Sequence, residues 1–271
     1  RPKLSQAQML DLINTDITTG VGKKIPHEAA ERHVTGEALY IDDRVEYANQ
    51  LHLYPVLSEI AHGLINHIDI SLCADVAGVE CVLLAPDIPG NPDIGPVLAG
   101  DPLLAADKVE YIGQVIAVVA ATSHAIARRA AALVKVDITP LKPILSVKEA
   151  HALKHYVLEP HTHTIGDANA ALTNAAHTLN GEFEIGGQEH FYLETQICST
   201  VPTEEGGMLV YSSTQHPSEV QKLVAQVIDV PLNKVSVDMR RMGGGFGGKE
   251  TQAAQPACLA ALASHLTNKP C

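Results

Sequence analysis

Residues 240–250 read RRMGGGFGGKE, in which five glycines surround a single phenylalanine. A strand pattern at 235–239 leads into this glycine loop, and a helical pattern at 251–266 follows it. Glycine tolerates positive φ and lets backbone N–H groups approach a ligand closely, while the first turn of a helix favours an anion or an oxo group. The stretch predicts a strand–loop–helix unit that holds a ligand with its backbone. The plain alternative is a turn that only packs tightly.

Two nucleotide-binding patterns fit this loop in part, GxxxxGK and GxGxxG. A phosphate loop needs Ser or Thr after the lysine as a magnesium ligand, and this chain has Glu250 there. A dinucleotide site expects an acidic residue about 20 positions downstream, whereas no Asp or Glu follows Glu250. Both nucleotide interpretations are therefore disfavoured.

Composition narrows the class of protein. The chain has 271 residues, of which 46% are hydrophobic, and this is enough for one large domain or two compact ones. Its formal net charge of -12 argues against nucleic acid or an anionic membrane as the main partner. We see no apolar run of membrane-spanning length and no secretory signal, so we expect a cytoplasmic protein without a membrane partner. The five cysteines form no CxxC pair, which predicts reduced thiols.

The pattern along the chain predicts an α+β protein in four segments. These are a lead-in arm at 1–28, a first domain at 29–145, a linker at 146–160 and a second region at 161–271. We expect strands at 51–57, 63–70, 79–84, 115–121, 134–138, 182–185, 194–201, 208–213 and 235–239, and helices at 71–76, 123–133, 217–228 and 251–266. Pro55 predicts an edge position or a bulge for the first strand, Ser71 and Ser123 are the expected N-caps of their helices, and Pro217 is an expected first helical residue. No strand follows the last helix, so we expect the second region not to close its own core and the chain to be incomplete.

Five further motifs accompany the glycine loop: GEALYIDD (36–43), LSEIAHG (57–63), YIGQVIAVV (111–119), GGQEHFYLE (186–194) and STQHP (213–217). Together they resemble the molybdenum hydroxylases of the xanthine dehydrogenase and aldehyde oxidase family, in collinear order over about residues 30–270. The resemblance implies an a/b hammerhead domain at 29–145, followed by the first part of the molybdopterin-binding domain at 161–271. The family continues beyond the position of Cys271, where its general base, a substrate-binding arginine and most pterin contacts lie.

The resemblance also implies site residues. Gln215 matches a glutamine whose amide hydrogen-bonds an oxygen ligand of molybdenum, which an amide can do without altering the charge at the metal. The loop residues that pack backbone N–H groups against the oxo side of the metal are Gly244, Gly245, Phe246, Gly247 and Gly248. Gln215 and Phe246 would thus lie near the metal without being side-chain ligands. Glu250 matches a substrate-facing glutamate that pairs with purine ring nitrogens and stabilises developing charge. A lone glutamate would by default be a first-turn acid of the helix.

The implied cofactor is molybdenum–molybdopterin, with 2Fe–2S clusters and FAD on partner segments or subunits. The implied reaction hydroxylates hypoxanthine- or xanthine-type purines with oxygen from water. Expected partners are the remainder of the molybdenum subunit and an Fe–S/FAD subunit, in a dimer of heteromers. One alternative is an aldehyde oxidase-type hydroxylase, although such members tend to carry an apolar residue at the position of Glu250. Another is a non-catalytic structural or phosphate-binding module. We expect the isolated chain to be inactive and free of cofactor.

Several polar residues receive no role. His151 and His155 have the spacing of two metal ligands on one helix face, but no third ligand is near in sequence. We interpret them, and the pair His161 and His163, as solvated side chains. The resemblance places 188–190 (Gln188, Glu189 and His190) near the cofactor without assigning chemistry.

Overall fold

The computed structural model describes residues 25–271 and divides the chain into two units, Arg1–Leu39 and Tyr40–Cys271. The described part of the first unit contains one helix, α2 (Ala30–Thr35), which ends at Gly36 in the left-handed conformation. The predicted lead-in arm at 1–28 lies almost entirely outside the described residues. The domain boundaries expected from the sequence remain predictions.

The first sheet of the second unit has the order β1-β5-β3, with bounds His52–Leu57, Val115–Ala121 and Val79–Leu83. It is antiparallel, and its central strand β5 is buried at every position, as a continuous apolar run predicts. β1 lies at the edge, where the missing N–H of Pro55 is tolerated, as expected. Helix α4 (His124–Ala131) packs against β1 and β5, and the predicted cap is confirmed because Ser123 Oγ accepts a hydrogen bond from Ile126 N.

The second sheet has the order β4-β2-β6, with bounds Lys108–Val109, Gly63–Asp69 and Lys135–Pro140. After β2 comes the short helix α3 (Ser71–Ala74), which ends two residues earlier than predicted. The predicted N-cap role of Ser71 is wrong. Asp69 Oδ1 accepts hydrogen bonds from both Ser71 N (3.0 Å) and Ser71 Oγ (2.6 Å), so the hydroxyl is already engaged. A short 3₁₀ helix, η1 (Ala85–Asp87), follows β3.

The third sheet has the order β7-β8-β9, with bounds Cys198–Pro202, Met208–Ser212 and Val235–Asp238. β8 is antiparallel to β7 and parallel to β9. Helix α7 (Pro217–Val227) connects the two parallel strands and starts at Pro217, as predicted. Helix α8 (Ala254–Thr267) packs against α7 and β7, with Pro256 in its first turn, where no intrahelical hydrogen bond is lost. Two 3₁₀ turns, η2 (Glu204–Gly206) and η3 (Leu232–Lys234), flank β8 and β9.

The first and third sheets share one hydrophobic core. Leu83 and Val118 from the first sheet belong to the same buried cluster as Val210 of β8, Leu223 of α7 and Leu262 of α8. The second region therefore packs on the first domain and does not bury its apolar side chains alone, which agrees with the expectation from the sequence.

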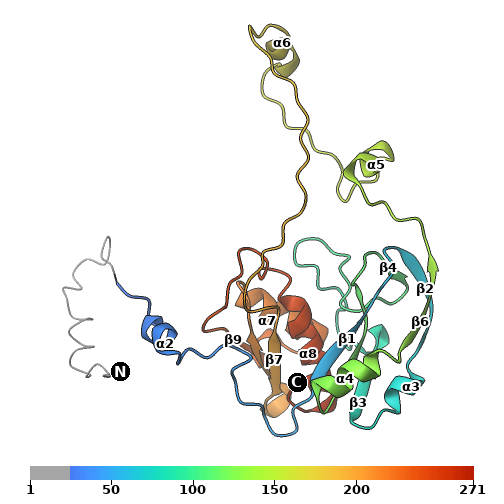
Figure 1. The fold of residues 1–271 in the computed structure, drawn as a ribbon, viewed down its shortest axis with the longest axis vertical. Coiled ribbons are helices and arrows are strands. Elements are labelled where there is room, and N and C mark those ends of the chain that lie inside the picture. The colour runs from blue at the N-terminus through green and yellow to red at the C-terminus, as the bar shows by residue number, and fades with distance from the viewer. Residues whose placement is uncertain (1–24) are drawn as a thin grey trace. The chain divides into compact units, whose positions relative to one another are not determined.

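Between β6 and β7 the chain runs through helices α5 (Val147–Ala152) and α6 (Ala168–Thr173) (Figure 1). Every residue from 151 to 191 is exposed. The predicted strand at 182–185 is wrong for this structure, because no neighbouring strand supplies hydrogen-bond partners to that segment. His151, His155, His161 and His163 are exposed, as the interpretation of solvated side chains predicted. Because α5 ends at Ala152, His151 and His155 share no helix face.

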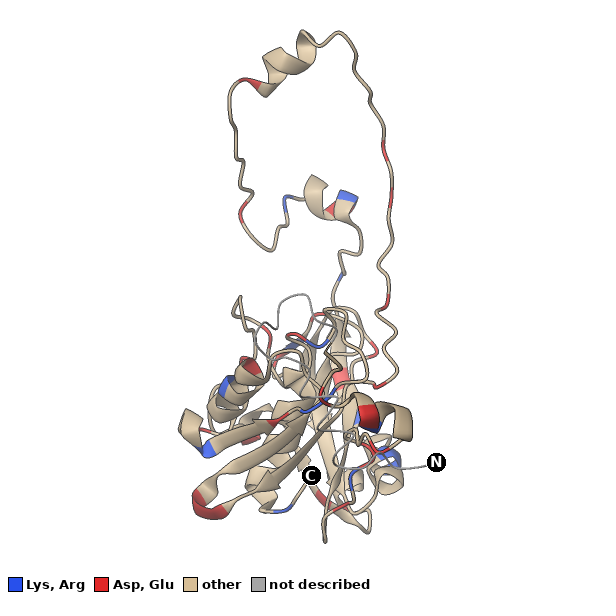
Figure 2. Cartoon of the chain, turned by 90° about the vertical axis from the view of Figure 1, so that its left-hand side faces the viewer, with Lys and Arg blue, Asp and Glu red and all other residues tan. Residues whose placement is uncertain are grey.

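Charge and hydropathy of the described part give two further facts. Lys and Arg positions are scattered over Tyr40–Cys271 and do not gather in one patch (Figure 2). Within residues 25–271, none of the helices is both long enough and apolar enough to cross a bilayer.

Candidate functional site

The predicted site residues meet at the carboxyl ends of β8 and β9. Residues 213–216 follow β8 and lead into α7, and residues 239–253 follow β9 and lead into α8. Because these two strands are parallel, both connections emerge at the same edge of the sheet, a common place for ligands in α/β units. The topology therefore brings Gln215 against the glycine loop.

The Gln215 amide is oriented by the loop. Its Oε1 accepts hydrogen bonds from Gly247 N (2.9 Å) and Lys249 N (3.2 Å), and its backbone N donates to Lys249 O at 2.8 Å. Its side chain is exposed, and its Nε2 group makes no hydrogen bond with any described residue. With the oxygen held inward, the amide presents its N–H donors outward, which suits a donor to an oxygen ligand.

Close packing explains two of the loop glycines. A Cβ at Gly245 would stand 2.6 Å from Gln215 Oε1, and a Cβ at Gly243 would collide with the side chain of Glu194. Any larger residue at either position would push the loop away from its neighbours. The glycine pattern is therefore a packing requirement of the loop against Gln215 and Glu194.

Phe246 has an unusual conformation at the tip of the loop. Its φ is 51°, in the left-handed region that non-glycine residues rarely occupy, and its side chain is 76% exposed. The backbone N–H groups of Gly244, Gly245 and Phe246 make no hydrogen bond among the described residues. By contrast, Gly247 N donates to Gln215, and Gly248 N donates to Gly245 O at 2.7 Å. Among the five predicted loop residues, three can offer N–H donors to a ligand and two stabilise the loop.

A buried ion pair beneath the loop was missed by sequence reasoning. The Lys249 side chain is fully buried, and its Nζ donates to Glu194 O (2.5 Å) and to Ser213 Oγ (2.7 Å). Nζ also lies 3.6 Å from Glu194 Oε2. Burial lowers the pKa of Lys249, and the Glu194 carboxylate opposes that shift. The available signal was the lysine itself, since a lysine among glycines at the start of a buried helix needs an acidic partner.

The other carboxylate bonds of Glu194 tie it to both sides of the site. Glu194 Oε2 accepts from Ser213 Oγ at 2.6 Å and from Gly243 N at 2.7 Å, and Glu194 N donates to Gly243 O at 3.2 Å. One acidic residue thus contacts the segment after β8 and the start of the glycine loop.

Aromatic and amide side chains line the other flank of the loop. A Cβ at Gly248 would lie 2.8 Å from Tyr192 Cε1 and 2.9 Å from His190 Cγ, so both rings lie against this glycine. Gln196 Nε2 donates to Tyr192 Oη (2.9 Å) and to Gly248 O (2.7 Å), while Gln196 Oε1 is buried without a hydrogen-bond partner. His190 therefore contacts the site, as the resemblance suggested. Glu189 contacts His190, whose N donates to Glu189 Oε1 at 3.1 Å and whose Nδ1 lies 3.9 Å from the same oxygen.

Glu250 follows the buried lysine and is exposed. It has no hydrogen bond or ion pair with the described residues. Helix α8 starts at Ala254 and has no acidic residue in its first turn, so the interpretation of Glu250 as a first-turn acid is wrong. The carboxylate is therefore free to contact a ligand beside the loop.

Two family models match this chain, one over each part. Residues 35–142 match the a/b hammerhead domain of aldehyde oxidase and xanthine dehydrogenase, and residues 150–271 match the molybdopterin cofactor-binding domain. The chain belongs to the aldehyde oxidase and xanthine dehydrogenase family. The fold class expected from the sequence is confirmed, with the hammerhead domain preceding the molybdopterin-binding domain.

Individual relatives agree with this assignment. The chain is 41% identical to xanthine dehydrogenase 1 of Arabidopsis thaliana, covering 99% of this chain and 20% of the relative, and 40% identical to probable aldehyde oxidase gad-3 of Caenorhabditis elegans, covering 92% and 20%. Among solved structures it resembles the aldehyde oxidoreductase of Desulfovibrio gigas, with a TM-score of 0.80 and 28% identity over 92% of this chain and 29% of that one. The chain thus spans about a fifth of the length of the curated relatives it matches.

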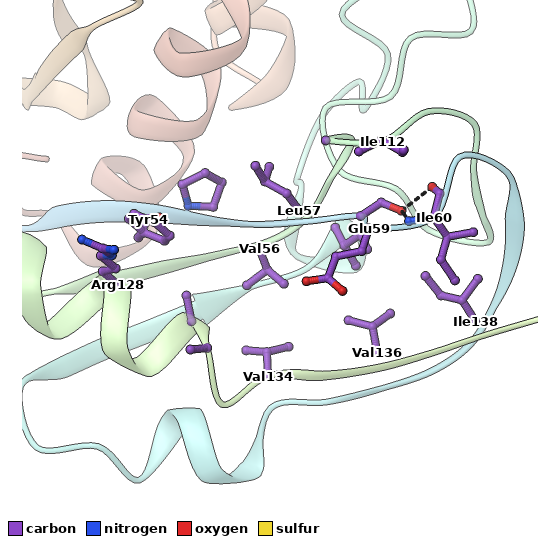
Figure 3. Close-up of a pocket in the computed structure, with 16 residues that line it drawn as sticks. Tyr54, Val56, Leu57, Glu59, Ile60, Ile112, Arg128, Val134, Val136 and Ile138 are labelled. Carbon is purple, nitrogen blue, oxygen red and sulfur yellow. Dashed lines mark hydrogen bonds between the residues drawn. The ribbon is translucent and has the colours of Figure 1, made fainter. Parts of the chain in front are cut away.

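Two cavities of the described part are lined by side chains other than those of Gln215, Phe246 and Glu250. One has a volume of about 760 Å³ and is lined in part by Val56, Val134 and Val136, with the carboxylate of Glu59 among these apolar side chains (Figure 3). A second, of about 710 Å³, reaches Gln196 and Gln252 beside the glycine loop. Neither is lined by Gln215, Phe246 or Glu250, so the predicted residues form an exposed surface of this chain.

The residues present fit a molybdopterin cofactor. The Gln215 Nε2 group and the backbone N–H groups of 244–246 have no protein acceptor among the described residues. The buried, unpartnered Gln196 Oε1 lies on the other flank. Donors without acceptors suit the oxygen ligands of a metal that its pterin carries in. Within residues 25–271, no group of three or more His, Cys, Asp or Glu could bind a metal ion directly.

Proposed function

We propose that this chain supplies the first part of the cofactor site of a molybdenum hydroxylase that acts on purines of the hypoxanthine and xanthine type. The observation that carries the proposal is the Gln215 amide, whose oxygen is held by Gly247 N and Lys249 N so that its N–H donors face outward. The unpaired N–H groups of 244–246 beside it support the same role. The hammerhead and molybdopterin-binding family matches agree with this class of enzyme.

The bound molybdenum cofactor would supply the two-electron oxidation that transfers water-derived oxygen to substrate. In that setting Gln215 and the 244–246 backbone donate hydrogen bonds to oxygen ligands and orient the cofactor. Phe246, exposed at the loop tip, would limit water on that side of the site. In each of these roles the residue binds or orients a group, and the glycine loop already fixes its position.

Glu250 decides the substrate class in this proposal. An exposed carboxylate next to the cofactor can pair with the ring nitrogens of a purine and stabilise charge that develops on the ring. The second candidate is an aldehyde-oxidising hydroxylase, favoured by the likeness to the Desulfovibrio gigas aldehyde oxidoreductase. An aldehyde offers no ring nitrogen for Glu250, so the exposed carboxylate supports the purine proposal.

Because the chain spans about a fifth of its curated relatives, the complete activity would need further parts. We propose that these are the remainder of the molybdenum subunit and a part with 2Fe–2S clusters and FAD that accepts the electrons. The assembly would be a dimer of heteromers in the cytoplasm. A non-catalytic structural or phosphate-binding role is the alternative that metal analysis tests.

The first experiment measures cofactor. The purified holoenzyme that carries this chain should contain molybdenum and fluorescent pterin in stoichiometric amounts, whereas the isolated 271-residue chain should contain neither. A holoenzyme without both would contradict the proposed function, and stoichiometric pterin in the isolated chain would contradict the proposed need for further parts.

The second experiment tests Glu250. We expect Glu250→Val to lower kcat/KM for xanthine at least about 10-fold, equivalent to about 1.4 kcal/mol, and to leave aldehyde oxidation within about 3-fold. Glu204→Val, at an exposed glutamate of η2, is the matched control and should change neither. Unchanged purine turnover in Glu250→Val would favour the aldehyde candidate.

A further inference from the structure

Lys249 occupies a position that the proposed chemistry does not use. It is the one fully buried lysine among the described residues, and its ammonium points under the loop toward Glu194, Ser213 and the Tyr192 ring, whose centroid is 4.6 Å away. A buried ammonium carries a high desolvation cost, so a surface loop has no reason to contain one unless its bonds are needed. The structure shows where those bonds lead.

The ammonium links the two ends of the glycine loop. At the start of the loop, Gly243 N donates to Glu194 Oε2 and Gly243 O accepts from Glu194 N. At its end, Lys249 Nζ donates to Glu194 O and to Ser213 Oγ. Both ends are thus attached to Glu194, which closes the loop into a ring.

The backbone of Lys249 connects this ring to the amide. Lys249 N donates to Gln215 Oε1, and Lys249 O accepts from Gln215 N (2.8 Å) and from Thr214 Oγ1 (3.3 Å). Any shift of Lys249 would therefore rotate or release the amide that the proposed function depends on.

We propose that Lys249 is a positioning residue, whose buried side chain closes the glycine loop on Glu194 and thereby holds the Gln215 amide with its N–H donors outward. This inference rests on the proposed function of Gln215. It assigns Lys249 no contact with substrate or cofactor, because the Nζ group is enclosed by protein.

The test measures loop opening and turnover separately. In the holoenzyme that carries this chain, Lys249→Met removes the charge and keeps most of the volume. Lys222→Met, at an exposed lysine of α7, is the matched control. We expect Lys249→Met to speed amide hydrogen exchange in peptides spanning 243–249 at least about 10-fold, in cofactor-free and loaded protein alike. Per bound molybdenum, kcat should fall about 10-fold while KM changes less than about 2-fold.

A double substitution separates positioning from plain loss of structure. If Lys249 acts through Gln215, Lys249→Met should cost less than about 2-fold in kcat once Gln215→Ala is present. An equal loss in both backgrounds would overturn the proposal, as would unchanged exchange of 243–249 in Lys249→Met. Should Lys249→Met fail to fold, Ser213→Ala removes one acceptor of the Lys249 Nζ group. We expect this variant to speed hydrogen exchange of 243–249 about 3-fold and to lower kcat about 3-fold. Unchanged exchange and kcat in Ser213→Ala would then overturn it.

The two proposals fail in different ways. A wild-type holoenzyme without molybdenum would contradict the proposed function, yet hydrogen exchange in the cofactor-free protein would still decide whether Lys249 closes the loop. A molybdenum-loaded wild type whose Lys249→Met variant keeps normal exchange would contradict only the role of Lys249.

Discussion

Strand β5 and the segment at 151–191 are both rich in large apolar residues, and their surroundings are opposite. β5 is buried at every position, between β1 and β3 and beneath α4. The 151–191 segment exposes ten large hydrophobic side chains: Leu153, Tyr156, Val157, Leu158, Ile165, Leu172, Leu179, Phe183, Ile185 and Phe191. Apolar sequence is therefore not sufficient for burial, because a side chain also needs a surface to pack against. An exposed apolar stretch of this length is typical of a contact surface.

The largest expected difference between the two regions is the loss of stability when a charge is placed in each of them. Val118→Asp puts a carboxylate at a buried position of β5, and we expect it to lower the free energy of unfolding by more than about 4 kcal/mol. Leu179→Asp makes a comparable change in the exposed segment and should cost less than about 0.5 kcal/mol. Since the chain has no tryptophan, urea unfolding followed by circular dichroism is the suitable measurement. Equal losses would show that the segment is packed in solution.

The second largest expected difference between the two regions is their rate of proteolytic cleavage in the isolated chain. Cleavage within 151–191 should be roughly 100-fold faster than within β5, because exposed chain needs no unfolding before it enters a protease. Mass spectrometry of a chymotrypsin time course identifies the first cuts. In the holoenzyme we expect protection of the same sites. Early cuts within 115–121 would contradict the contrast between the two regions.

The smallest effect concerns two helix caps with the same chemistry. Ser123 Oγ caps α4, which is packed on the first sheet, and Ser146 Oγ caps α5, which has no buried residue. Ser123→Ala should lower the free energy of unfolding by about 1 kcal/mol, since losing the cap weakens a helix that belongs to the core. Ser146→Ala should leave the midpoint of chemical denaturation unchanged, because no residue of α5 is buried in the folded state. Chemical denaturation of both variants is the check, and equal shifts would refute the argument.

The local sequence pattern was sufficient to predict the helices and strands that bury apolar residues. The expected strand at 115–121 and the helices opened by Ser123 and Pro217 occur as predicted, because an apolar run, a cap and a first-turn proline each act within a few residues. Pattern failed at 182–185, where alternation predicts a strand but strand formation needs a neighbouring strand. It also missed α6, although Asp167 caps that helix through Ala170 N.

For the candidate site, the amino-acid pattern by itself singled out the glycine loop at 243–248. Gln215 and Glu250 were chosen because of the family resemblance, and their roles stay predictions. The sequence did not predict that Lys249 turns inward to Glu194 or that Gly247 and Lys249 orient the Gln215 amide. Those facts depend on hydrogen bonds between segments far apart in the chain. They arise only once β8 and β9 lie side by side and bring both connections to one edge of the sheet.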